Sequence, residues 1–256
     1  KKLSMGRDLV VYCWRGGQRS AILSWLLSVA GLNVFRLEGG YKAFRQNVHQ
    51  SFSRPLSLLM VTGKTGSGKT QILQSLARAG QKVIDLERLA NHRGSAFGGI
   101  DMPPQPTQEH FENLLAFELS GIFGGHIWVE GESRCIGKVR IPDELFAQMQ
   151  KCASIQIEIS LASRVRRVLE EYGHYDPQIL REKTQSITKR MGGDRVKISL
   201  EALDRGDMQA WVIPLLEYYD KTYLHSIESR IIPPKKWDIN GLTMEEIIRE
   251  IKLYAK

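Results

Sequence analysis

The sequence from residue 56 to residue 70 reads LSLLMVTGKTGSGKT, and this stretch decides the fold. Its first part, Leu56–Val61, is apolar enough to form a buried strand. Its last part, Gly63–Thr70, matches the pattern G-x-x-x-x-G-K-[ST] completely. A helical pattern follows from about Lys69 to Ala79, and Gly80 supplies a stop. A strand, a glycine-rich loop and a helix in this order predict a phosphate-binding loop (P-loop).

Every residue of this loop is a candidate phosphate ligand: Gly63, Lys64, Thr65, Gly66, Ser67, Gly68, Lys69 and Thr70. Glycines let the backbone N–H groups turn toward phosphate oxygens, and the helix presents its positive N-terminal end. Lys69 is expected to act as a catalytic cation on the outer phosphates, and Thr70 is a possible Mg²⁺ ligand. The loop therefore predicts a ligand with a diphosphate or triphosphate, and no tightly bound cofactor is expected.

An acidic partner of a P-loop usually lies at the end of a neighbouring strand. Glu130 ends the predicted strand His126–Glu130, and Glu132 follows two residues later. Asp85, in the predicted strand Lys82–Leu86, is a rival, and Arg93 is a candidate second cation on the ligand. An ordinary solvated carboxylate or loop arginine remains an open alternative at each of these positions.

Strands and helices alternate beyond the P-loop, which predicts a parallel sheet with helices on both faces. The fold class is therefore α/β, with a P-loop NTPase-like sheet and flanking helices. The predicted elements are a helix capped by Thr107 to about Phe123, a helix beginning at Pro142, a strand Ile155–Ile159, a helix Ala162–Tyr172, a mainly helical region 177–229 and a final helix Thr243–Lys256.

A second strand–loop–helix unit opens the chain. We expect a strand at residues 9–12, a helix at 20–30, a strand at 33–37 and a short helix at 41–46. A polar stretch around Asn47–Pro55 predicts a boundary, with one domain over residues 1–52 and another over 53–256.

Cys13 follows the first strand and is a candidate catalytic residue. Its loop comprises Trp14, Arg15, Gly16, Gly17, Gln18 and Arg19. Loop N–H groups, the following helix and two arginines would favour the thiolate and would also stabilise an anionic persulfide or perselenide. The alternative is a small buried apolar side chain, which is the usual role of a free cysteine. Cys135 is a weaker second candidate thiol.

The net charge of +8 favours a polyanionic partner. Three cysteines without regular spacing disfavour both a disulfide framework and structural zinc. No run approaches the roughly 20 apolar residues of a membrane span, and no signal peptide is recognised, so we predict a cytoplasmic protein without membrane contact. The oligomeric state is not predicted.

A helix with Arg164 and Arg167 is a candidate RNA contact. Aromatic residues on a later helix, Trp211, Tyr219 and Tyr223 among them, could stack on bases, although such residues more often belong to a core. The two arginines could instead reach over the P-loop ligand.

The segment Cys13–Ser20 resembles the active-site loop of rhodanese-type sulfurtransferases, whose cysteine carries a transferable chalcogen. A rhodanese half followed by a P-loop half resembles tRNA 2-selenouridine synthase. The segments 85–87, 91–98 and 129–134 look like other characteristic segments of that family, and the resemblance covers essentially the whole chain. A rhodanese domain has a first half before its cysteine strand, so residues 1–52 are expected to be the second half only.

The resemblance implies action on the wobble uridine of tRNAs that carry 2-thiouridine there. A geranyl group from geranyl diphosphate is first attached to sulfur, and the geranylthio group is then replaced by selenium from selenophosphate. The P-loop domain would grip the diphosphate, and Cys13 would deliver selenium. Two alternatives stay open: a P-loop kinase or NTPase with a vestigial sulfurtransferase tail, and an RNA-binding module that retains the P-loop.

Overall fold

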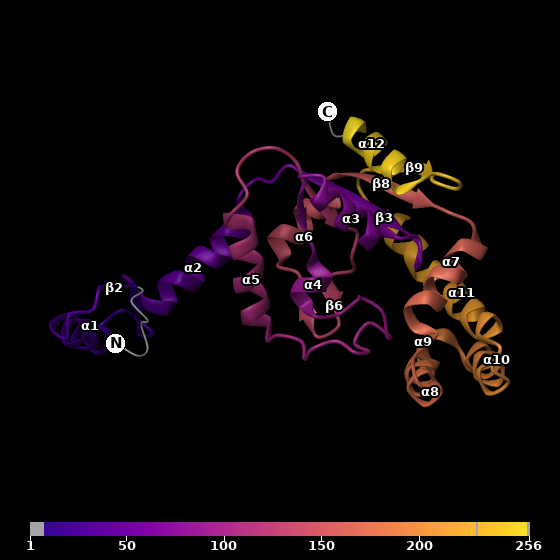
Figure 1. The fold of residues 1–256 in the computed structure, drawn as a ribbon, viewed down its shortest axis with the longest axis horizontal. Coiled ribbons are helices and arrows are strands. Elements are labelled where there is room, and N and C mark those ends of the chain that lie inside the picture. Colours follow the sequence, from indigo (N-terminus) through magenta and orange to yellow (C-terminus); the bar gives the residue numbers. More distant parts are fainter. Residues whose placement is uncertain (1–7, 229, 255–256) are drawn as a thin grey trace. The chain divides into compact units, whose positions relative to one another are not determined.

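The computed structural model describes residues 8–228 and 230–254. The chain divides into two compact units, Lys1–Arg54 (unit 1) and Pro55–Lys256 (unit 2), which are drawn together in Figure 1. Residues 1–7 of the expected first domain lie outside the described part, as do residues 255 and 256 of the expected last helix. Among the described residues, no helix combines the length and the apolar character needed to cross a membrane.

Unit 2 is built on a five-stranded parallel sheet with the strand order β4-β5-β3-β8-β9. The strands are β3 (Leu58–Gly63), β4 (Lys82–Ile84), β5 (Ile127–Glu130), β8 (Ala153–Glu158) and β9 (Lys235–Asp238). All residues of β3 are buried, as expected for the central strand of a sheet covered on both faces. Val61 pairs with Glu130 across β3 and β5, so Glu130 ends its strand beside the start of the P-loop.

Helices cover both faces of this sheet. On one face, α3 (Lys69–Arg78) and α12 (Met244–Tyr254) pack against Leu59, Val61 and their strand neighbours. On the other face, α6 (Asp143–Lys151) packs on β3, and Tyr223 of α11 (Met208–Glu228) contacts Thr62 through a hydrogen bond of 3.1 Å. The predicted α/β class with flanking helices is confirmed.

A second core lies in the helical region of unit 2. It joins α7 (Leu161–Tyr172), α8 (Pro177–Ser186), α9 (Thr188–Met191) and α10 (Gly193–Asp204) to α11. Trp211 is 1 % exposed, and its indole N–H donates to Thr184 Oγ1 at 3.1 Å. Trp211 therefore belongs to the core, and a surface stacking role for it is wrong.

Several predicted boundaries differ from the structure. The strand predicted at Lys82–Leu86 ends at Ile84, because the Asp85 side chain accepts from Arg88 N–H and begins α4 (Leu86–Ala90). Pro142 is the N-cap of α6 rather than its first residue. Thr107 caps α5 (Gln108–Ser120) as predicted. The hairpin of β6 (Cys135–Ile136) and β7 (Val139–Arg140) was not predicted, nor was β9.

Unit 1 is a parallel β–α–β–α arrangement of β1 (Leu9–Val11), α1 (Gln18–Val29), β2 (Val34–Arg36) and α2 (Gly40–Ser53). The short helix expected at 41–46 runs on to Ser53, so the polar stretch read as a linker is mostly helical. Val48 and Phe52 stand one turn apart on α2 and are buried, which gives the helix an apolar stripe that the polar residues between them obscure.

Candidate functional site

The P-loop connects β3 to α3 with the backbone that its sequence requires. Gly66 and Gly68 have φ values of 78° and 88°, in the left-handed region that favours glycine. Gly68 is the N-cap of α3, and Ser67 N–H donates to Lys64 O at 3.0 Å inside the loop. The loop therefore curls directly into a helix N-terminus, the arrangement that binds phosphate.

Glu130 holds the two functional side chains of the loop. Lys69 Nζ lies 3.4 Å from Glu130 Oε1, and Thr70 Oγ1 donates to Glu130 Oε2 at 3.2 Å. Both Lys69 and Glu130 have largely buried side chains. The pairing of Val61 with Glu130 sets this contact, because it aligns the ends of two parallel strands. Of the acidic residues expected near the loop, Glu130 is the one that contacts it.

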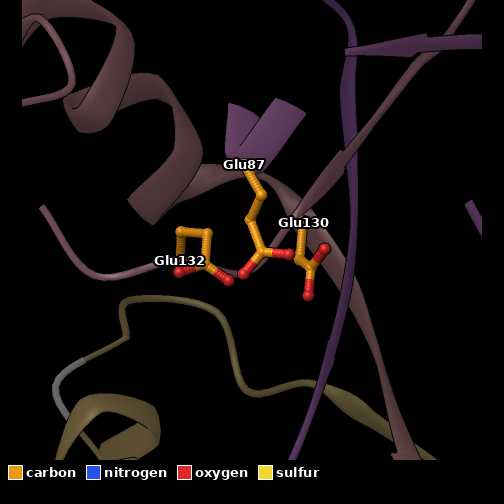
Figure 2. A group of neighbouring side chains, drawn as sticks. All are labelled: Glu87, Glu130 and Glu132. Atoms are coloured by element: carbon orange, nitrogen blue, oxygen red, sulfur yellow. The ribbon is translucent and has the colours of Figure 1, made fainter. Parts of the chain in front are cut away.

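Two further carboxylates join Glu130. Carboxylate oxygens of Glu87, Glu130 and Glu132 all lie within 4.8 Å of one another. Figure 2 shows the carboxylate of Glu87, from α4, between those of Glu130 and Glu132. Gly94 packs directly against this acidic group. A Cβ at position 94 would lie 2.6 Å from Glu132 Oε2 and 3.2 Å from Glu87 Oε1, so a larger side chain would crowd both carboxylates. Asp85 does not contribute a carboxylate to this group and caps α4 instead.

Burial raises the pKa of each carboxyl group in this acidic group. It raises the pKa of Glu87 to about 10 and that of Glu132 to about 8, and repulsion from neighbouring carboxylates adds to both shifts. Burial also raises the pKa of Glu130, although Lys69 opposes the shift. For Lys69, burial opposes the charge, but attraction by Glu130, Glu132 and Glu87 outweighs it and raises its pKa. The three carboxyl groups therefore do not all ionise near neutral pH unless a cation joins them.

Arg93 lines the same cavity as the P-loop. Its Nε lies 3.3 Å from Glu171 Oε1, and its guanidinium stands 5.9 Å from the centre of the Tyr172 ring. Its Nη1 is buried and has no hydrogen-bond partner in the described structure. An unpaired buried donor is costly, so this Nη1 is the one buried atom of the Arg93 guanidinium whose hydrogen bond the described residues leave unmade.

One cavity of about 250 Å³ connects these groups. Its polar lining, which we call the polar end, comprises the P-loop, the acidic group and Arg93. Its apolar lining, which we call the apolar end or apolar chamber, comprises Phe97, Val168, Tyr172, Trp211, Val212, Leu215 and Leu216. Two further polar groups of the lining are already paired: Tyr219 OH accepts from Ala96 N–H at 3.2 Å, and Tyr223 bonds to Thr62. One cavity therefore combines charged and apolar side chains.

The two arginines of α7 hold the P-loop from outside the cavity. Arg164 Nε donates to Thr65 O at 2.8 Å, and Arg167 Nη1 donates to Ser67 O at 2.6 Å. Arg164 also donates to both carboxylate oxygens of Asp220, at 2.8 and 2.5 Å. Lys64 is 3.4 Å from the same Asp220. Arg164 is 4 % exposed, so an RNA contact by its guanidinium would require breaking these bonds.

Cys13 lies in unit 1, in the loop between β1 and α1. Its Sγ is 3.4 Å from Ser20 Oγ. This hydrogen bond is the largest factor that lowers the thiol pKa to about 6, and backbone N–H groups of Ser20, Gly17 and Arg15 act in the same direction. Arg15 and Arg19 are exposed beside it. A thiolate is therefore favoured at neutral pH, but its main cause is the Ser20 side chain and not the charges of Arg15 and Arg19 that the sequence suggested.

The remaining candidate thiols lack such surroundings. Cys135 is exposed on β6 of unit 2, and burial raises the pKa of Cys152. Three side chains of the site were not predicted, namely Glu87, Glu171 and Asp220. Glu87 directly follows the predicted strand Lys82–Leu86, and the other two lie on helices far along the chain. The sequence signal for a helical turn at Glu87 is the spacing of the apolar residues around it, which continue to Ala90.

A P-loop, a strand-end carboxylate bound to its lysine and a parallel sheet define unit 2 as a P-loop α/β protein. Residues 56–234 match the model of the tRNA 2-selenouridine synthase AAA domain. The chain belongs to the tRNA 2-selenouridine synthase family, a family of enzymes of the transferase type.

Two relatives illustrate this membership. The chain is 36% identical to the tRNA 2-selenouridine synthase of Sulfurovum sp. (strain NBC37-1), and 34% identical to that of Nitrosomonas europaea. Each match covers 88% of this chain and 71% of the relative. A solved tRNA delta(2)-isopentenylpyrophosphate transferase from Staphylococcus epidermidis aligns with 78% of this chain and 98% of its own, at 13% identity and a TM-score of 0.41.

Proposed function

We propose that this chain modifies the wobble uridine of tRNA in two steps, geranylation of 2-thiouridine and then replacement of the geranylthio group by selenium. Geranyl diphosphate supplies the prenyl group, and selenophosphate supplies selenium. Membership of the family supports the product, 2-selenouridine. The single observation that carries the geranyl step is the cavity, because it joins a diphosphate-binding loop to an apolar chamber.

The polar end of the cavity fits the diphosphate of the donor. Loop N–H groups and the N-terminus of α3 face the phosphate oxygens, and Lys69 supplies a full positive charge beside them. Arg93 lines the same cavity and has an unpartnered Nη1. Two positive groups near a leaving diphosphate stabilise the charge that develops as it departs.

The apolar end fits a geranyl chain better than a nucleoside. A prenyl chain has no polar atoms, so Phe97, Trp211 and Leu215 satisfy it by burial alone. A base and a ribose would bring several donors and acceptors into a chamber where Tyr219 and Tyr223 are already hydrogen-bonded. Unpaired polar groups of a buried ligand weaken its binding, which disfavours ATP as the ligand of this cavity.

The acidic group fits a divalent cation such as Mg²⁺. Glu87, Glu130 and Glu132 converge within 4.8 Å, and Thr70 Oγ1 lies on the same side of the loop, bonded to Glu130. Oxygen ligands of this kind are those that Mg²⁺ prefers, and the cation would resolve the repulsion among the three carboxylates. Bound there, Mg²⁺ would neutralise part of the charge of the diphosphate.

The first step forms a carbon–sulfur bond. The sulfur of 2-thiouridine attacks C1 of the geranyl group, the C1–O bond breaks, and diphosphate leaves with the bonding electrons. Lys69, the loop N–H groups and Arg93 stabilise that leaving group. S-alkylation also prepares the second step, because a geranylthio group leaves carbon 2 of the base more readily than a thiocarbonyl sulfur does.

Unit 1 is assigned to the second step. The selenium of selenophosphate replaces the geranylthio group at carbon 2, geranylthiol is released, and water frees the phosphoryl group as phosphate. Cys13 is the reactive group that unit 1 provides, with a thiol pKa lowered to about 6 and two exposed arginines nearby to attract an anion. The segment Cys13–Ser20 resembles a rhodanese loop, which supports a role in chalcogen transfer.

The proposal is tested by incubating the chain with 2-thiouridine tRNA and geranyl diphosphate, followed by mass spectrometry of the nucleosides. A geranylated nucleoside is expected, and its conversion to 2-selenouridine is expected after selenophosphate is added. Folded protein that yields no geranylated product would contradict the proposal. Titration with geranyl diphosphate and with ATP, each with Mg²⁺, adds an independent measurement, in which geranyl diphosphate should bind more tightly.

A second candidate is a P-loop kinase or NTPase. Glu130 at the end of the strand beside the P-loop, bonded to Lys69 and Thr70, is an arrangement that such enzymes also use. This reading predicts tight binding of Mg·ATP and a turnover that Cys13→Ala leaves unchanged. Weak ATP binding beside tight binding of geranyl diphosphate would exclude it.

A further inference from the structure

Unit 1 carries nearly all of the net charge of the chain. Residues 1–54 contain nine lysines and arginines but two acidic residues, whereas the rest of the chain is close to balanced, with 27 against 26. The acidic residues of unit 1 are Asp8 and Glu38. Since a polyanion binds where positive charge is concentrated, the charge distribution directs a nucleic acid to unit 1 rather than to the helices of unit 2.

Four aromatic side chains gather at the loop that carries Cys13. The Tyr41 ring is central, with centroids of Tyr12, Trp14 and Phe44 at 6.0, 5.8 and 5.7 Å. Tyr12 and Trp14 are 56% and 53% exposed, so these rings are not a buried core. We name this set the aromatic cluster. Exposed rings in mutual contact can stack further on planar groups from solution.

Backbone hydrogen bonds fix the cluster to the cysteine loop. Tyr41 N–H donates to Cys13 O, and Lys42 N–H donates to Trp14 O, both at 2.9 Å. The start of α2 therefore holds the rings and the thiol as one rigid arrangement. Arg15 from the loop and Lys42 from α2 are exposed beside the rings and provide cations for phosphates.

We infer that the aromatic cluster, with Arg15 and Lys42 beside it, binds the single-stranded RNA of the anticodon loop. The inference rests on the proposed function, in which carbon 2 of the wobble base must come next to Cys13 for selenium to be delivered. Bases of a single-stranded loop can be splayed out and stacked on aromatic rings, whereas bases inside a duplex cannot. Tyr12, Trp14, Tyr41 and Phe44 supply that stacking surface around the thiol, and the cations fix the backbone.

The test uses the full chain and a fluorescent RNA hairpin with the sequence of an anticodon stem-loop that carries 2-thiouridine at the wobble position. Fluorescence anisotropy gives the dissociation constant. Trp14→Ala and Tyr41→Ala are each expected to raise it about 5- to 100-fold, which corresponds to the loss of stacking on one base. Trp14→Leu should weaken binding similarly, while Trp14→Phe should keep most of the affinity. Binding of a blunt RNA duplex should not respond to any of these changes.

Two control variants distinguish the loss of base stacking from a general loss of structure or of positive charge. Trp25, on α1, is 64% exposed but lies outside the aromatic cluster, so Trp25→Ala should leave the dissociation constant within about twofold of the wild-type value. Lys42→Gln should weaken the binding of hairpin and duplex alike. It should also reduce the slope of the logarithm of the dissociation constant against the logarithm of the salt concentration by about one. Cys13 alkylation at pH 7 confirms that each variant keeps the loop intact.

The outcomes distinguish this inference from the proposed function. If the wild-type chain binds the hairpin and both Trp14→Ala and Tyr41→Ala bind it equally well, the inference is overturned, and tRNA remains the substrate by another surface. If the wild-type chain does not bind the hairpin at all, both the inference and the tRNA part of the proposed function fail. Geranyl diphosphate binding, measured on the same preparations, reports on unit 2 independently.

Discussion

Ser20 controls the reactivity of Cys13. The Ser20 hydroxyl lies 3.4 Å from Sγ and is the largest cause of the lowered thiol pKa. Ser20 is itself buried, and its hydroxyl oxygen lies 3.0 Å from Gly17 O as well as near Sγ, so its position is set by the first turn of α1. The hydroxyl has one proton, which stabilises the thiolate when it turns from Gly17 O to Sγ. The arrangement lets a neutral hydroxyl, rather than a histidine or a lysine, stabilise the thiolate.

The pH dependence of Cys13 alkylation follows from this contact. Because the pKa of Cys13 is lowered, the thiolate is lost only as the pH falls through about 6. The rate of alkylation by iodoacetamide should therefore rise with pH, with its midpoint around that value and a plateau above it. Ser20→Ala should move the midpoint upward toward the ordinary thiol value. The measurement uses a Cys135→Ser, Cys152→Ser background. A midpoint that Ser20→Ala does not move would show that Ser20 is not responsible.

At the scale of elements, α7 is the support of the P-loop. Arg164 and Arg167 are one turn apart and donate to the carbonyls of Thr65 and Ser67. By binding the carbonyls, α7 fixes the loop in the conformation that turns N–H groups toward phosphate. Asp220 of α11 holds Arg164 in place and connects α7, α11 and the loop.

Arg164→Ala should therefore destabilise unit 2 and weaken binding of the diphosphate. It leaves Asp220 without its bidentate partner, and breaking a buried pair costs about 3–5 kcal/mol. For a unit of this size that corresponds to a fall in Tm of roughly 10 °C. Arg166 is the matched control on the same helix, because it is 71% exposed and pairs only weakly with Glu170 at 3.8 Å. Calorimetry of Arg166→Ala should show a Tm within about 1–2 °C of the wild-type value.

The elements also show what the sequence could and could not predict. The P-loop, its strand and its helix follow from local pattern, because eight adjacent residues carry both the turn and the ligand groups. Glu130 was predicted because it ends an apolar strand. Glu87 was not, since Asp85 converts an apparent strand into a helix turn, and that depends on a single capping bond. The roles of Arg164 and Asp220 depend on how α7 packs on α11, which no local pattern contains.

For the whole molecule, the proposed function assigns one step to each unit. We predict that Cys13→Ser stops selenium incorporation but leaves geranylation, whereas Lys69→Ala lowers geranylation about 100- to 1000-fold. Lys69→Ala supplied with geranylated tRNA should still incorporate selenium. Nucleoside mass spectrometry measures both steps in one digest. Equal loss of both steps in the Cys13→Ser variant would contradict the division.

Ligand binding should stabilise only one unit. At about 100 times its Kd, geranyl diphosphate should add about 2.7 kcal/mol to the stability of unit 2. Amide hydrogen exchange should slow in the P-loop, β5 and α7 and stay unchanged in α1 and α2. The same experiment with inorganic diphosphate separates the contribution of the apolar chamber. Protection of α1 or α2 by geranyl diphosphate would show that the ligand also acts on unit 1.

The cavity also has a consequence for synthesis of the protein. Its lining begins at Gly63 and ends at Tyr223, and Trp211, Leu215 and Leu216 complete its apolar wall. A ribosome therefore makes the P-loop long before it makes the wall. The nascent chain cannot retain a prenyl diphosphate until α11 has emerged and packed on α7, and until then the apolar residues of the chamber are open to chaperones.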